Sequence, residues 1–158
     1  FLTLRELEIP VTANEIGEKH HVKPSLISKN ARKYARVLKK SHKLHAFNTQ
    51  SWVDKTTTQL GTDADFYYDL RRLSEFVERV LDNGQIGMTR TYFAATVWLL
   101  NLMRRKNEVK QGDVCEICSI ARTSLRNAYN RLLPMVNCEL DDLKNMTVDE
   151  FISGIRIR

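Results

Sequence analysis

The chain of 158 residues carries 25 Lys and Arg against 19 Asp and Glu, a net charge of +6 that favours anionic partners. No apolar stretch approaches the roughly 20 residues needed to cross a bilayer, so neither a membrane-spanning helix nor a membrane partner is expected. Three cysteines are an odd number without the spacing of a disulfide framework, which argues against a secreted, disulfide-rich domain.

The first part of the chain predicts the tail of one helix, then a short helix, then a longer one. The tail over 1–7 ends before Pro10, because the residue that precedes a proline is pushed out of the helical conformation. A Thr or an Asn can cap a short helix over 12–19. Pro24 then opens a helix that runs to about Lys40, since the first helical position needs no amide donor.

This longer helix and its flanks are strongly basic. The segment contains nine basic residues and no acidic one: Lys19, Lys23, Lys29, Arg32, Lys33, Arg36, Lys39, Lys40 and Lys43. A solvated charged helix is one interpretation. The exclusion of Asp and Glu over several helical turns favours the other, a surface that faces phosphates.

The middle of the chain predicts two further helices of unequal signal strength. Residues 41–61 are polar and mixed, which indicates a connection followed by a weakly signalled helix around Trp52. A stronger pattern begins at Asp63, because apolar residues between Phe66 and Leu81 recur at steps of three and four. Asn83-Gly84 supplies the stop signal.

The next segment, Thr91 to Met103, is apolar nearly all round, which is typical of a helix surrounded by other helices. After it, Val109 to about Pro134 repeats the pattern of Val11 to about Arg36 at a constant shift of 98 residues. The shift pairs Val11 with Val109, Glu15 with Asp113, Ile16 with Val114, Val22 with Ile120, Ser25 with Thr123 and Ile27 with Leu125. Repetition at a fixed spacing indicates repeated structural units. With no alternating strand pattern, we predict an all-α fold.

Several motifs of the second copy resemble the cyclin-type repeats of transcription factor IIB. They are Gly87-Met88-Thr89, Gln111 through Glu116, Thr123-Ser124-Leu125-Arg126 and Leu132-Leu133-Pro134, with Asn14-Glu15-Ile16 in the first copy. The resemblance covers nearly the whole chain and is nearest in character to the divergent trypanosomatid members. It implies two tandem cyclin-like helical repeats, the first truncated at its N-terminus. The expected division is 1–45 for the first repeat and connection, 46–136 for the second repeat and 137–158 for a C-terminal extension.

The resemblance also implies a function. A member of this family is a general transcription initiation factor that binds the TATA-binding protein on promoter DNA in the nucleus and helps recruit RNA polymerase II. The RNA polymerase III version and an archaeal homologue remain open. A kinase-regulating cyclin has the same helical unit but binds a protein surface, and a generic helical interaction module is a third possibility.

In the second copy, Arg126 is the sharpest candidate for DNA recognition, with Thr123 one turn earlier on the same face. An Arg can donate two hydrogen bonds to guanine O6 and N7 in the major groove. The resemblance implies the same role, because these positions match those with which the family reads an upstream promoter element. Arg122 and Asn127 flank them and suit phosphates. The alternative for Arg126 is a surface ion pair.

In the first copy, the short side chains of Ser25 and Ser28 could let the helix lie close to a DNA backbone. Four cations around them would neutralise phosphates and make binding depend strongly on salt: Lys23, Lys29, Arg32 and Lys33. Three lysines in the connection could contact either DNA or the TATA-binding protein: Lys39, Lys40 and Lys43.

Cys115 and Cys118 form a Cys-x-x-Cys, but a structural zinc site would need a second pair and a redox motif a βαβ context. We therefore expect these cysteines to pack, with no metal. His20-His21 is expected to be a solvated turn, and Trp98 and Tyr129 are expected to lie in the core. The sequence has no glycine-rich phosphate loop and no suggestive carboxylate pair, so neither a cofactor nor an enzyme is predicted.

Overall fold

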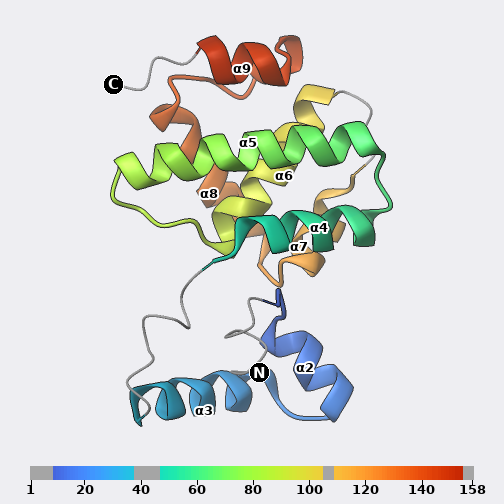
Figure 1. The fold of residues 1–158 in the computed structure, drawn as a ribbon, viewed down its shortest axis with the longest axis vertical. Helices are drawn as coiled ribbons and strands as arrows, with labels where there is room; N and C mark the ends of the chain where they lie inside the picture. Colours follow the sequence, from blue (N-terminus) through green and yellow to red (C-terminus); the bar gives the residue numbers. More distant parts are fainter. Residues whose placement is uncertain (1–8, 38–46, 105–108, 155–158) are drawn as a thin grey trace. The chain divides into compact units, whose positions relative to one another are not determined.

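The computed structural model describes residues 9–37, 47–104 and 109–154. All regular structure in these ranges is helical, which confirms the all-α prediction (Figure 1). The chain divides into two compact units, residues 1–52 and 53–158. The helices are α2 (Ala13–His20), α3 (Pro24–Val37), α4 (Thr49–Leu60), α5 (Ala64–Asn83), α6 (Arg90–Arg104), α7 (Gln111–Ile117), α8 (Arg122–Met135) and α9 (Val148–Gly154), with a 3-10 turn η2 (Asp142–Asn145). The predicted helix tail at 1–7 and the predicted end of the basic helix at 38–40 lie outside the described residues.

In the first unit, a capping box marks the start of α2, and a glycine permits the tight turn that follows the helix. The Thr12 hydroxyl accepts from the Glu15 amide at 3.2 Å, and the Glu15 carboxylate accepts from the Thr12 amide at 2.7 Å. Such a capping box satisfies two amides at the helix start. At the other end, a Cβ on Gly17 would lie 2.5 Å from the Val22 carbonyl oxygen, so glycine permits the close approach of the following turn. Pro24 is the first residue of α3, as predicted.

The second unit is built around α6, which packs against α5, α7, α8 and η2 (Figure 1). Its side chains are buried on nearly every side, including Phe93, Ala94, Ala95, Leu99 and Leu100. This confirms the prediction of a surrounded core helix. Trp98 and Tyr129, which were also expected in the core, are only half-buried. No helix within the described ranges is long and apolar enough to cross a membrane.

α5 begins and ends where the sequence predicts, after Asp63 and at Asn83-Gly84. Asp63 caps it by accepting from the Phe66 amide at 2.6 Å. At its end Gly84 has an ordinary φ of −81°, and Gln85 instead adopts the left-handed conformation with φ 58°. The Ile86 amide then bonds the Leu81 carbonyl at 2.8 Å, which closes a Schellman motif. The predicted stop at Asn83-Gly84 is confirmed, and the left-handed residue of this helix end is Gln85.

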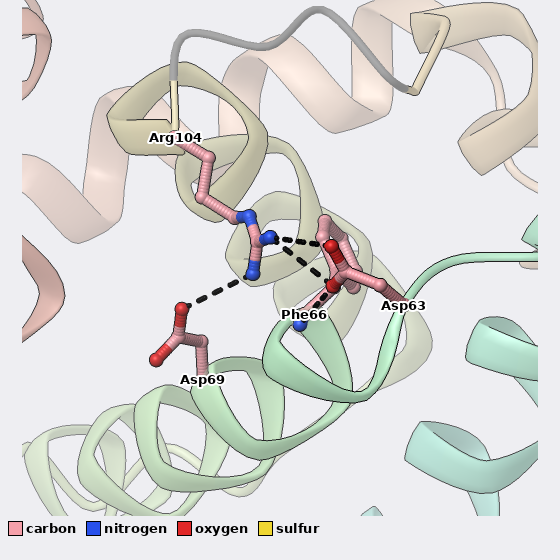
Figure 2. A network of polar contacts seen from close by, with 4 residues as sticks. All are labelled: Asp63, Phe66, Asp69 and Arg104. Atoms are coloured by element: carbon pink, nitrogen blue, oxygen red, sulfur yellow. Dashed lines mark hydrogen bonds and ion pairs between the residues drawn. The ribbon is translucent and has the colours of Figure 1, made fainter.

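Arg104 joins the end of α6 to the beginning of α5 (Figure 2). Its guanidinium donates to both carboxylate oxygens of Asp63, at 3.1 and 3.0 Å, and to Asp69 at 3.3 Å. The same group lies 5.5 Å from the ring centroid of Phe66, and only 10% of its side chain is exposed. Burial raises the pKa of Asp69 above its ordinary value, although Arg104 opposes this. These contacts connect the C-terminal end of α6 to the N-terminal end of α5.

The C-terminal extension is helical over most of its described length. α9 packs on α5, where the rings of Phe76 and Phe151 meet edge to face at 5.9 Å. Arg72 of α5 also pairs with Asp149. The acidic stretch that follows Cys138 therefore forms η2 and the start of α9.

Candidate nucleic-acid interface

The two helix pairs predicted from the repeat have matching bounds. α2 and α7 begin 98 residues apart, and α3 and α8 both begin and end at that same shift. The turns match as well, since His21 and Ser119 adopt left-handed φ values of 52° and 49°. In both turns the next amide bonds a carbonyl five residues back at 2.9 Å. The duplicated helix-turn-helix pattern is thus present in the structure.

The outward face of α8 holds the residues expected to contact DNA. Thr123, Arg126 and Asn127 are exposed, while Leu125 on the opposite side is fully buried. α8 contains no acidic residue. Within the described ranges, the side chains of these three exposed residues make no hydrogen bond or ion pair, so the expected ion-pair alternative for Arg126 has no partner there.

Arg122 differs from its neighbours because it leans towards α7. A Cβ on Gly112 would lie 3.3 Å from an Arg122 guanidinium nitrogen. Burial raises the pKa of the Cys115 thiol, and the charge of Arg122 lowers it, which agrees with a guanidinium near α7. Arg122 is exposed, but it lies at the edge of the α8 face nearest to α7.

A buried amide anchors this helix pair to the core. The Asn101 side chain donates to the Val109 carbonyl at 3.1 Å and accepts from the Val109 amide at 3.1 Å. Both residues are buried. Two hydrogen bonds to one backbone unit set the point at which the chain enters α7, and hence where α8 begins.

The exposed cations of α3 lie closer together along the helix than those of α8. Of the predicted residues, Lys23, Ser25, Lys29, Arg32 and Lys33 are exposed and Ser28 is half-buried. α3 has no acidic residue. Lys39, Lys40 and Lys43, expected to contact DNA or the TATA-binding protein, lie outside the described residues.

The cysteines and histidines occupy the predicted environments. Cys115 and Cys118 are buried, as a packing role requires, and His20 and His21 are exposed at the turn. Among the described residues, no three His, Cys, Asp or Glu side chains gather as metal ligands would.

Two exposed residues of α8, Asn130 and Arg131, and the buried Asn101 were not singled out from sequence. Asn130 could have been found by continuing one helical turn, or four residues, past Arg126, whereas Arg131 lies five residues on and does not continue that spacing. Asn101 had no such signal, because a polar residue in an apolar helix does not indicate which backbone group it meets.

No known protein-family model matches the chain, and comparisons with curated proteins and with solved structures likewise gave no match.

Proposed function

We propose that the chain is the DNA-binding core of a general transcription initiation factor of the transcription factor IIB type. It would bind the TATA-binding protein on promoter DNA in the nucleus and help recruit RNA polymerase II. The observation that carries the proposal is the duplicated helix pair, in which α3 and α8 each present an exposed face free of acidic residues. The transcription factor identity is supported by the motifs from Gly87 to Pro134.

In this proposal α8 enters the major groove and recognises sequence. Arg126 is exposed and has no partner within the described residues, so its guanidinium is free to donate to guanine O6 and N7. Thr123, one turn earlier, can contact a base edge or a thymine methyl group. Asn127 contacts phosphate beside them and contributes to position rather than to sequence preference.

The α3 face provides affinity without sequence preference. Lys29, Arg32 and Lys33 lie on one side of the helix, and the small Ser25 and Ser28 on the same side let a phosphate backbone approach. Each cation that contacts a phosphate releases counterions, so the logarithm of affinity falls by about 0.9 per contact with the logarithm of salt concentration. The two faces thus divide the work of binding, α3 by charge and α8 by hydrogen-bond pattern.

The test is a salt series of binding to promoter DNA, with and without the TATA-binding protein, for the wild type and two variants. Arg126→Ala should reduce the preference for the upstream sequence by about 1–3 kcal/mol, the value of one bidentate base contact. The double variant Lys29→Gln/Lys33→Gln should retain that preference, weaken binding to all sequences and reduce the salt slope by about 2.

Binding that is cooperative with the TATA-binding protein and behaves in this way supports the promoter assignment. Absence of DNA binding at low salt, even with the partner present, would contradict it. A preference that survives Arg126→Ala would contradict the assigned role of α8.

A second candidate is a cyclin-like module that regulates a kinase. The observation in its favour is that the first unit exposes several large apolar side chains in a short stretch: Ile9, Val22, Leu26 and Tyr34. Exposed apolar surface is typical of protein-binding sites. Recovery of a kinase on immobilised chain in the absence of DNA, lost in Leu26→Ser/Tyr34→Ser, would favour this candidate over the first.

A further inference from the structure

The exposed face of α8 carries one more residue in line with Arg126. A helix turns by about 100° per residue, so positions separated by three, four or seven lie on one side. Asn130 is four residues after Arg126 and seven after Thr123, and it is exposed. Thr123, Arg126 and Asn130 therefore form a row along the helix, which we call the α8 row.

Asn127, which flanks Arg126 in the chain, is less well aligned with Arg126 than Asn130 is. Asn127 lies four residues after Thr123 and three before Asn130, so it borders the same row, but it points about 100° away from Arg126, whereas Asn130 deviates from Arg126 by only about 40°. The buried Leu125 and Leu132 lie on the opposite side of α8, against the core. If Arg126 faces base edges, Asn130 is the neighbouring side chain that faces them too.

The amide of Asn130 can bond a base edge, and its alignment with Arg126 is what distinguishes it from the amide of Asn127. The Asn130 amide offers a donor and an acceptor side by side and no charge, so it contributes little to attraction by the phosphate backbone. In α3 the position 98 residues earlier is Arg32, a cation. An uncharged amide in the α8 row can instead bond adenine N6 and N7 together. The Asn130 side chain has no hydrogen-bond partner among the residues that the structure describes.

We infer that Asn130 is a second base-reading residue, specific for adenine, in the DNA complex proposed above, and the inference rests on that function. Four residues of helix advance by about 6 Å, close to two base-pair rises of about 3.4 Å. The recognised site thus contains an adenine within about two base pairs of the guanine bound by Arg126. Helices that enter the major groove in other folds also spread their base contacts over two turns.

The experiment selects duplexes from a library with twelve randomised base pairs beside a fixed TATA element, using the full chain together with the TATA-binding protein at low salt. Four proteins are compared: wild type, Arg126→Ala, Asn130→Ala and Asn127→Ala as the matched exposed amide. Asn130→Ala should keep the guanine preference and lose the adjacent adenine preference about tenfold. Asn127→Ala should keep both base preferences and weaken binding to all sequences alike, because Asn127 is assigned to a phosphate. Ala has a higher helix propensity than Asn at an exposed position, so Asn127→Ala and Asn130→Ala should remain folded.

Asn130→Asp is a sharper variant, because a carboxylate can only accept and therefore pairs with the cytosine amino group rather than with adenine. The expected result is a change of preferred base from adenine to cytosine at that one position. Loss of adenine preference in Asn127→Ala instead of Asn130→Ala overturns the inference and leaves the proposed function intact. Selection of no sequence by any protein overturns both. A guanine preference that depends on Arg126, with no effect of either Asn130 variant, overturns the inference alone.

Discussion

The α2–α3 pair and the α7–α8 pair have the same left-handed turn and the same helix bounds at the shift of 98, apart from one residue at the end of α7, yet they differ in what supports them. α7 and α8 pack on the core helix α6, and Leu132 of α8 is fully buried. Tyr34 occupies the corresponding position of α3, and 59% of it is exposed. Residues within the helix pair are therefore sufficient to set the helix bounds and the turn, whereas the burial of its side chains depends on neighbouring helices.

The pairs also differ in surface chemistry. At three matched positions the first has Lys29, Arg32 and Lys33, where the second has Asn127, Asn130 and Arg131. Two cations are thus replaced by amides on the same geometry. This difference in charge on a shared backbone geometry supports the proposed division between phosphate binding by α3 and base recognition by α8.

The largest difference between the pairs should appear when matched side chains are truncated. Leu132→Ala should lower the free energy of unfolding by about 2–5 kcal/mol, because it leaves a cavity in the core. Tyr34→Ala at the same repeat position should change it by no more than about 0.5 kcal/mol, since the side chain is exposed. Chemical denaturation measures both, and equal losses would contradict the difference in support.

The second pair should also depend on its buried amide. Asn101→Ala leaves the Val109 amide and carbonyl buried without these partners and should cost about 1–3 kcal/mol. Amides of α7 should exchange hydrogen faster, while those of α2 keep their rates. The exposed Asn130→Ala is the control. Unchanged exchange in α7 would mean that Asn101 does not anchor this pair.

The first pair should be sensitive at its close turn. Gly17→Ala places a Cβ 2.5 Å from the Val22 carbonyl oxygen and should destabilise α2–α3 by about 1–3 kcal/mol. Gly112→Ala in α7 meets only the flexible end of Arg122 and should be neutral or stabilising by up to about 1 kcal/mol. Hydrogen exchange resolves each helix pair, and a tolerated Gly17→Ala would show that the turn relaxes easily.

Because both turns contain a left-handed residue, we expect glycine at that residue to stabilise both helix pairs, by less than the preceding substitutions destabilise them. His21→Gly and Ser119→Gly each relieve a side chain in a left-handed conformation and should stabilise their own pair by about 1 kcal/mol. Thermal unfolding followed with hydrogen exchange measures both. A gain in one pair with a loss in the other would indicate that the two turns are not equivalent.

The smallest effect concerns pH and is confined to the second unit. Because the pKa of Asp69 is raised on folding, the folded chain holds its proton more tightly than the unfolded chain does. The resulting stability is present below the ordinary pKa and is lost as pH rises through the folded pKa. Denaturation from about pH 3 upward should show this loss in the wild type and not in Asp69→Asn. Identical pH profiles would contradict the raised pKa.

Much of the fold was predictable because its signals are local. Asp63 and Pro24 start helices through their own side chains, and the apolar steps from Phe66 to Leu81 predict a helix with one buried face. The candidate DNA-contacting residues Thr123 and Arg126 were found from the repeat, and their exposure agrees with that role. Their binding to DNA stays a prediction.

What could not be predicted depends on partners distant in the chain. Asn83-Gly84 predicted the end of α5, but not that a Cβ on Gly84 would lie 2.9 Å from the Met135 side chain, nor that Gln85 takes the left-handed position. Arg104 lies at the end of α6, and no local pattern indicates that it binds carboxylates 41 and 35 residues away.

The sequence by itself determined the helices, the turn between them and their duplication at 98 residues, because caps, prolines and apolar periodicity act within one or two helical turns. Only the tertiary structure decided that α6 supports the second pair, that Asn101 sets the start of α7 and that Asn130 continues the row of Arg126 on an exposed face. Burial and hydrogen-bond partners depend on which segments meet in space, and periodicity along the chain does not specify that.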